Sequence, residues 1–263
     1  MRWEELTGDL FPQAVLQVGG VCLLPLSCIE RHGHHLPLGT DMFIARELCN
    51  RAAALESAVV FPDFIFTQIL EARHYPGCIG IEPELTVRLL EAACREIARN
   101  GLKKIVIVNA HGGNDHLIHY FAQIQLASPR DYVVYVADFH RDDSSTDSLW
   151  ETTVDGHAGE RETSAILAIR PELVRKDALP TDGEGMPRER LKELRDLNTD
   201  MGVWWYADHP SHYRGDGIPA TAEKGERSFA DCAKALAKVI RAIKDDTETK
   251  RLQDEFFGKI NQF

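Results

Sequence analysis

The stretch Lys103-Lys-Ile-Val-Ile-Val-Asn109, followed directly by Ala110-His-Gly-Gly-Asn114, decides the fold. Its unbroken apolar run predicts a strand that is buried on both faces, as the central strands of parallel sheets are. The paired glycines allow the backbone to turn sharply where the strand ends. A helix is expected over 115–126, so the stretch predicts one strand–turn–helix unit of an α/β protein.

The same alternation continues on both sides of this stretch. Short apolar runs predict further strands, and apolar residues at helical spacing predict helices. The expected strands lie at 21–26, 58–62 and 132–138, and the other expected helices at 41–55, 82–99, 160–169 and 226–246, the last being the final helix. Thr40 or Asp41 is the expected N-terminal cap of the helix at 41–55. The segment 142–147 is a predicted loop, and 180–213 is expected to be irregular. Parallel βαβ units follow, with ligands beyond the carboxyl ends of the strands.

Composition excludes several function classes. The 263 residues carry a net charge of −11, which argues against a general nucleic-acid-binding surface. No apolar run approaches the roughly 20 residues that cross a bilayer, and the N-terminus lacks the apolar core of a signal peptide. The six cysteines form no CxxC pair and are interpreted as buried free thiols. We therefore expect a cytoplasmic globular protein that binds neither nucleic acid nor membranes.

The first group of candidate site residues follows the strand at 21–26. Glu30 and His32 are two positions apart and project to one side of an extended chain. Both residue types bind zinc, manganese or iron, and a carboxylate such as Asp41 can bridge two ions. Alternatively, Asp41 only caps the following helix, and Glu30 with His32 forms a surface pair.

The second group follows the strand at 103–109, where an α/β enzyme places its site. His111 is a candidate metal ligand, and Asn109 or Asn114 a candidate hydrogen-bond partner of a ligand side chain or of the substrate. The alternative is a plain glycine-rich turn capped by Asn114. A phosphate cradle is a weaker interpretation, because the stretch has neither a P-loop lysine nor GxGxxG spacing.

The third group is Asp155-Gly-His-Ala-Gly-Glu-Arg-Glu-Thr-Ser164, which opens a predicted helix. His157 has a side chain suited to proton transfer near neutral pH. Glu160 and Glu162 are candidate site carboxylates, although the helix dipole alone favours acids in a first turn.

In order, spacing and flanking residues, these groups resemble the signatures of the creatininase family. Two further motifs agree with this resemblance, which extends from about Leu23 to Glu226. The matching stretches are Leu24–Asp41, Tyr75–Gly77, Asn109–Asn114, His157–Ser164 and Ala220–Glu226. Several motifs in register are far more specific than a single pair of histidines.

The resemblance implies a three-layer α/β/α fold with a mostly parallel central sheet, formed by one domain over residues 1–263. It also implies a centre of two divalent ions per chain, either zinc, iron or manganese. Glu30, Asp41 and His111 would hold one ion, and His32 would hold the other with Asp41 as the bridge.

The resemblance further implies an enzyme that hydrolyses amide-type C–N bonds and assembles as a homohexamer. Its expected partner is a small-molecule amide. His157 would be the acid/base residue, with Glu160 or Glu162 assisting as base or ligand. His74 and Asn114 are the expected substrate contacts, and His34 and His35 are further candidates near the site.

One departure from creatinine hydrolase concerns the residues after the metal-binding histidine. That enzyme has Tyr and Glu where this chain has Gly112 and Gly113. We therefore expect a wider site, a substrate other than creatinine, and Glu162 in place of the missing carboxylate, with Glu160 less favoured. The same His-Gly-Gly-Asn form resembles relatives that deformylate a formamidopyrimidine or trim a precursor peptide. Trp204 and Trp205 would cap the mouth of the site or pack a loop or subunit contact.

Two other function classes remain open at this stage. The first is an inactive homologue that binds metal without turnover. The second is a nucleotide-handling α/β protein that uses Gly112 and Gly113 as a phosphate turn at the start of a helix. The absence of a GxSxG motif argues against a serine nucleophile.

Overall fold

The computed structural model describes residues 1–138, 147–180 and 183–260. Its centre is an all-parallel sheet in the order β2 (Val59–Val60), β1 (Val21–Leu26), β3 (Lys104–Asn109), β4 (Val133–Asp138). The predicted strands and the mostly parallel sheet are thus confirmed. Because Leu26 pairs with Asn109 in the register of β1 and β3, the segments that follow these two strands start side by side.

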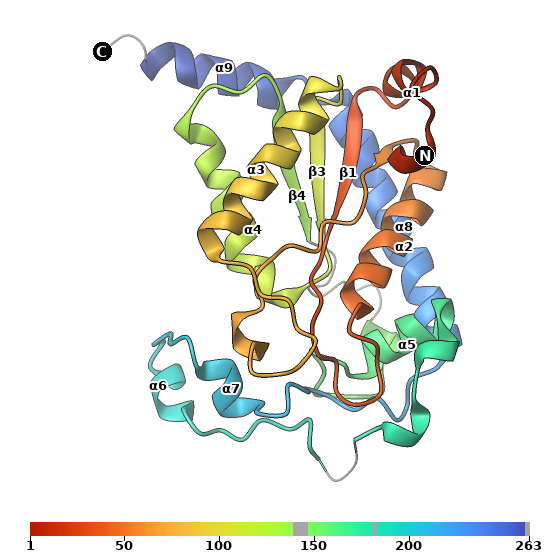
Figure 1. Ribbon diagram of the computed structural model, residues 1–263, viewed down its shortest axis with the longest axis vertical. Coiled ribbons are helices and arrows are strands. Elements are labelled where there is room, and N and C mark those ends of the chain that lie inside the picture. The colour runs from red at the N-terminus through yellow and green to blue at the C-terminus, as the bar shows by residue number, and fades with distance from the viewer. Residues whose placement is uncertain (139–146, 181–182, 261–263) are drawn as a thin grey trace.

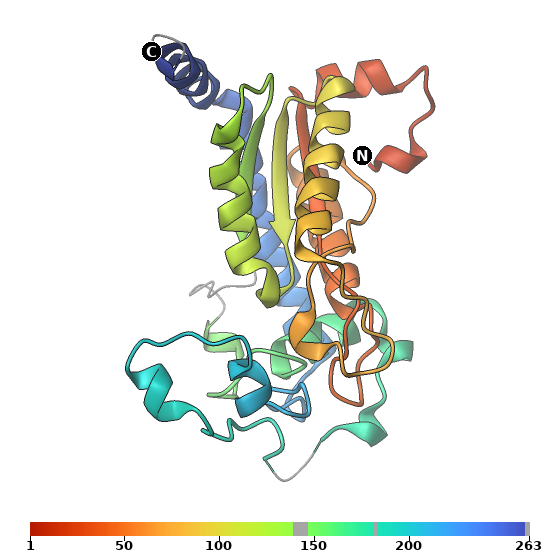
Figure 2. The same ribbon diagram turned by 60° about the vertical axis from the view of Figure 1, so that its left-hand side comes forward.

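Side chains of the central strands alternate between two hydrophobic cores. Cys22 and Ile105 belong to the core under α3 (Pro83–Arg99) and α4 (Asp115–Ile124). Leu23 and Val106 belong to the core under α2 (Thr40–Leu55) and α8 (Ala222–Asp245). Figures 1 and 2 show these two helix pairs on opposite faces of the sheet. A strand whose side chains enter both cores must be apolar throughout. With helices covering both faces of the sheet, the predicted three-layer α/β/α fold is confirmed.

The predicted cap of α2 is wrong. Gly39 is the residue before the helix, and no side chain caps it. Thr40 lies inside the helix and donates its hydroxyl to the carbonyl oxygen of Pro37 at 2.8 Å. The Asp41 carboxylate, in the first turn, is therefore free for contacts outside the helix.

The C-terminal part differs from the prediction. Helix α8 begins earlier than expected, because the Thr221 hydroxyl accepts a hydrogen bond from the Lys224 amide. It is not the final helix: α9 (Glu248–Ile260) follows. This helix was missed because its sequence is highly charged and buries little, with Phe257 its one buried residue.

Apart from the helix that precedes β1, the remaining elements lie mainly at the carboxyl end of the sheet (Figure 1). Helix α1 (Phe11–Gln17) precedes β1, and α5 (Glu160–Ile169) packs along α8. The predicted irregular segment contains two short helices, α6 (Lys192–Asp196) and α7 (Trp204–Asp208), and lies beyond the strand ends (Figure 1). Most of the loop predicted at 142–147 lies outside the described residues. Along the described chain, no helix has the length and apolar character needed to cross a bilayer.

The contact between α5 and α8 predicts a sensitive glycine. A Cβ atom added at Gly225 would lie 2.0 Å from the carbonyl oxygen of Ser164. We expect Gly225→Ala to lower the free energy of unfolding by about 1–3 kcal/mol, the usual cost of overpacking. Gly258→Ala in α9 is the matched control: its Cβ meets nothing within 4 Å, and alanine gains roughly 0.5–1 kcal/mol over glycine in a helix. Urea titration of both variants checks this, and equal stabilities would contradict it.

Candidate metal centre

The candidate centre lies at the carboxyl ends of β1 and β3. Glu30 and His32 lie on the segment that leaves β1, and His111 lies just after β3. Asp41 joins them from the first turn of α2. The sheet therefore brings together residues that are about 80 positions apart in the chain, as open α/β sheets do at their carboxyl edge.

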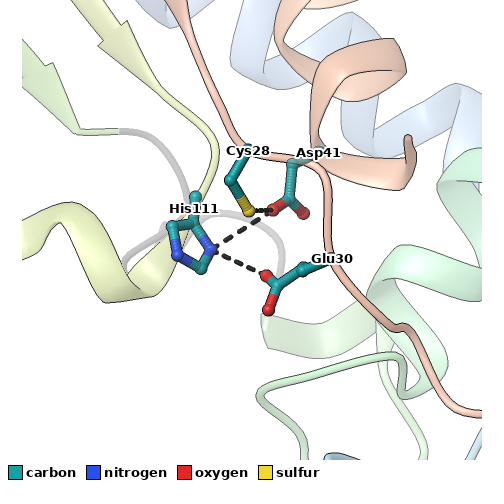
Figure 3. A group of neighbouring side chains, drawn as sticks. All are labelled: Cys28, Glu30, Asp41 and His111. Atoms are coloured by element: carbon teal, nitrogen blue, oxygen red, sulfur yellow. Dashed lines mark hydrogen bonds and ion pairs between the residues drawn. The ribbon is translucent and has the colours of Figure 1, made fainter. Parts of the chain in front are cut away.

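One side of the centre is formed by Glu30, Asp41, His111 and Cys28 (Figure 3). The Nδ1 atom of His111 lies 2.8 Å from Oε1 of Glu30 and 3.2 Å from Oδ2 of Asp41. The Cys28 thiol donates to the same Asp41 oxygen at 3.2 Å. All four side chains are buried, with ligand atoms within 4.8 Å of one another. Three of them were predicted from the sequence as site residues. Cys28 is a buried free thiol, as predicted, but its contact with Asp41 was not expected.

The other side of the centre uses the second oxygen of Asp41. Oδ1 of Asp41 lies 2.9 Å from Nε2 of His32, and Oε2 of Glu162 lies 3.5 Å from the same nitrogen. The Nδ1 atom of His32 lies 3.2 Å from the carbonyl oxygen of Glu30. A carbonyl oxygen accepts only, so Nδ1–H donates to it and Nε2 is the atom left for a metal. A ring N–H held by a carbonyl is the usual arrangement of a metal-binding histidine.

The electrostatics of this cluster fit a cation site. Burial lowers the pKa of His32 on its own, but the Asp41 carboxylate outweighs it and raises the pKa to about 10. For His111, the Glu30 carboxylate likewise overcomes burial and raises the pKa well above its ordinary value. Burial raises the pKa of Glu162 to about 8. Protons on these groups offset the charge of the buried Glu30 and Asp41 carboxylates and of the half-buried Glu162. Divalent ions could replace those protons, because imidazole and carboxylate are ligands of zinc, manganese and iron.

The structure separates the two glutamates of α5. The Glu162 carboxylate accepts a hydrogen bond from the Ala158 amide at 2.5 Å and faces His32. The Glu160 carboxylate accepts from the amide of Thr152 at 2.9 Å and forms an ion pair with Lys224. The catalytic role expected for Glu160 is not supported by this position. Two positions apart on a helix, the side chains point to different sides.

His157 lies over the centre without joining its closest contacts. Its Nε2 atom donates to the carbonyl oxygen of Arg31 at 2.8 Å, and its ring centroid lies 4.3 Å from that of His32. Nδ1 therefore carries the lone pair, 3.9 Å from Oε1 of Glu30. Burial lowers the pKa of His157 to about 3. The ring is thus neutral near pH 7, with the lone pair of Nδ1 facing the centre.

The expected widening of the site is wrong at Gly113. A Cβ atom there would lie 2.5 Å from Nε2 of His111 and 2.6 Å from both Nε2 of Gln68 and Oε1 of Glu71. Gln68 also donates to the Gly113 carbonyl oxygen at 2.6 Å. Side chains from the segment after β2 therefore take the space, and neither residue carried a signal in the sequence.

A pocket of about 440 Å³ opens onto the centre, a size suited to a small ligand or part of a larger one. Its wall includes four candidate ligands together with His157, Trp204, Trp205, His212 and Arg214, and the ligands are Glu30, Asp41, His111 and Glu162. His212 was not predicted as a site residue, since nothing in the local sequence pattern distinguishes it from the neighbouring histidines.

The expected substrate contacts lie elsewhere. His74 is exposed and packs against Tyr75 and Tyr206. Asn114 is buried and donates to Asn109 at 3.2 Å, which steadies the turn that carries His111. Neither side chain is part of the pocket wall. His34 is exposed beside Arg31, and His35 is buried against Thr163.

Comparison with known proteins shows the family of this chain. The family model "Creatininase: Creatinine amidohydrolase" matches residues 4–240. The chain belongs to the creatininase family. A mycofactocin precursor peptide peptidase of Mycobacterium ulcerans is 32% identical over 235 residues, covering 82% of this chain and 84% of the relative. The creatinine amidohydrolase of Pseudomonas putida is 27% identical over 190 residues, covering 66% and 73%.

Solved structures of the family share the fold. A crystal structure of creatinine amidohydrolase superposes with a TM-score of 0.76 at 23% identity, over 94% of this chain and 98% of that chain. Other similar structures are a manganese creatininase and a zinc–zinc form of a creatininase variant. At this identity the likeness concerns the fold.

The position of His35 predicts a pH dependence of stability. Its Nε2 atom lies 2.9 Å from the Thr163 hydroxyl, Nδ1 is buried without a hydrogen bond, and burial lowers the pKa to about 4. Between about pH 6.5 and 4 the unfolded chain binds more protons at this histidine than the folded chain, so stability falls as pH falls through that window.

The expected effect can be measured without metal. From pH 6.5 to pH 5, about 1.5 units at 1.36 kcal/mol each, His35 should lower the free energy of unfolding by about 2 kcal/mol. His35→Gln should remove that part of the slope in urea titrations with EDTA, whereas the exposed neighbour His34→Gln serves as the control. Parallel pH profiles of wild type and His35→Gln would contradict the assignment.

Proposed function

We propose that this protein is a metal-dependent hydrolase of an amide C–N bond, with a main substrate other than creatinine. The observation that carries the proposal is the position of Asp41. One of its oxygens faces His111, which also contacts Glu30, and the other faces His32, which is near Glu162. Asp41 thus has imidazole and carboxylate groups on both sides, and this arrangement would suit a pair of divalent ions.

In this proposal the ligands divide into two sets that share Asp41. Glu30, Asp41 and His111 would hold one ion, and His32, Asp41 and Glu162 would hold the other. The ions are zinc, iron or manganese, since the donor set suits all three. When bound, they would supply an activated water and polarise the amide carbonyl.

The remaining steps fall to side chains of this chain. The Arg31 carbonyl orients His157 by accepting from its Nε2–H, so that Nδ1 faces the centre. There it would take up the proton released by the attacking water and pass it to the leaving nitrogen as the C–N bond breaks. Trp204 and Trp205, in the pocket wall, shield the reaction from bulk water. Glu160 has a different task in this proposal: with Lys224 it holds the 151–152 segment beside α5.

Three substrate classes are candidates in this proposal. We retain a non-peptide or cyclic amide as the first candidate. A precursor-peptide bond is the second, favoured by the higher identity and coverage of the Mycobacterium ulcerans peptidase. A formamide is the third, because a formylaminopyrimidine deformylase of Methanococcus maripaludis is 29% identical over 113 residues. The homohexamer remains a prediction.

The first test separates ligand from proton-transfer residue. Asp41→Ala should lose bound metal on both sides and all hydrolysis, because it removes the shared ligand. His157→Ala should keep its metal but lose about 10²–10⁴-fold in rate, the usual contribution of an acid/base group. Elemental analysis of both proteins, beside turnover, checks the pair. Full metal content in Asp41→Ala, or metal loss in His157→Ala, would refute the assigned roles.

The second test concerns the substrate. Metal-loaded protein should hydrolyse creatinine with a kcat/KM below about 10⁴ M⁻¹s⁻¹, the lower end of ordinary enzyme efficiency. The physical reason is that this chain has Gly112 and Gly113 where creatinine hydrolase has two larger side chains. Without the aromatic one, a flat ring lacks a wall on which to stack. A panel of cyclic amides, formamides and short peptides, assayed in parallel, identifies the preferred class. Efficient creatinine hydrolysis would overturn the exclusion, and no turnover of any amide would leave an inactive metal-binding homologue.

A further inference from the structure

The ring of His212 is held between an indole and a carboxylate. The Nε1–H of Trp205 donates to Nδ1 of His212 at 2.8 Å. An indole nitrogen donates only, so Nδ1 must accept, and the imidazole proton must reside on Nε2. The tautomer of His212 is therefore set by Trp205.

The protonated nitrogen of His212 faces a candidate metal ligand. Nε2 lies 2.6 Å from Oε2 of Glu30, and the two side chains are 3% and 1% exposed. The other oxygen of Glu30, Oε1, faces His111. One carboxylate oxygen thus receives a hydrogen bond, while the other points to the place proposed for the ion.

The backbone at His212 supports a specific role for this side chain. His212 has φ +54°, in the left-handed region that residues with a Cβ rarely adopt. A backbone of this kind persists where surrounding contacts outweigh its cost of about 1–3 kcal/mol. The Trp205 and Glu30 hydrogen bonds are such contacts.

The segment from Trp204 to His212 forms one wall of the pocket through the side chains at its two ends. We call residues 204–212 the cap segment. Away from the centre it is fastened by the Tyr75 hydroxyl, which donates to the Pro210 carbonyl oxygen at 2.5 Å, and by an ion pair between Arg195 and Asp208. His212 connects the same segment directly to Glu30.

We propose that His212 is a positioning residue that couples ion binding at Glu30 to docking of the cap segment. The inference rests on the proposed function, because it needs an ion at Glu30. The hydrogen bond from His212 fixes the rotamer of Glu30 and leaves Oε1 for the ion, so a docked cap segment favours a bound ion. By reciprocity, a bound ion favours the docked cap segment to the same extent.

The first experiment measures ion affinity. Wild-type protein is stripped of metal and titrated with Zn²⁺ or Mn²⁺ against a competing chelator. His212→Asn should weaken binding about 10–100-fold, the usual effect of removing a partner of a metal ligand. Asparagine is chosen because it tolerates positive φ but is too short to reach Glu30. His212→Gln, which restores an N–H donor at that reach, should recover most of the affinity.

Two further variants separate the hydrogen bond from general damage. Trp205→Phe keeps a ring but frees the His212 tautomer, so it should weaken binding less than His212→Asn does. His209→Asn is the matched control: His209 is also buried and packs on Trp205, but none of its contacts reaches Glu30. It should bind the ion as wild type does.

The second experiment reads the coupling itself by hydrogen–deuterium exchange. Adding Zn²⁺ should protect amides of residues 204–212 in wild type and in His209→Asn, but not in His212→Asn. Wild-type affinity and protection in His212→Asn would overturn this inference while leaving the proposed function intact. Equal losses in His212→Asn and His212→Gln would also overturn it, by pointing to ring packing. If wild type binds no ion at all, the proposed function itself fails.

Discussion

The burial of Glu30 and Asp41 side by side is the constraint on which the rest of the site depends. Two carboxylates that are each 1% exposed are costly unless opposite charge or hydrogen bonds compensate them. His111 and His32 supply that compensation in the structure, and their pKa values are raised as a result. Because this cluster needs bound protons to offset the charge of its buried carboxylates, divalent cations in their place would stabilise it.

The parallel sheet makes this concentration of charge possible. Pairing of β1 with β3 places Leu26 beside Asn109, so two unrelated loops leave the sheet at one point. Helices on both faces hold the strands through two separate apolar cores. The rigid part of the molecule thereby fixes where the loops begin, and the loops supply the chemistry.

Helix α5 and the segment around α7 complete the site. Close packing of α5 on α8 at Gly225 orients the helix so that Glu162 faces His32 and Glu160 faces Lys224. The α7 segment contributes aromatic walls to the pocket. The core of the site is thus built on a sheet, while its outer wall is built on irregular chain.

The sequence by itself determined the strands, most helices, and the candidate ligands that lie in compact motifs, because local periodicity and short spacing are properties of neighbouring residues. It determined neither α9, whose charged surface gives a weak apolar pattern, nor the choice between Glu160 and Glu162, which depends on the rotation of a packed helix. Only the tertiary structure placed Cys28 on Asp41, Gln68 beside Gly113, and His212 on Glu30. Most of these contacts join distant parts of the chain, and no local pattern records which distant side chains the fold brings within hydrogen-bonding distance.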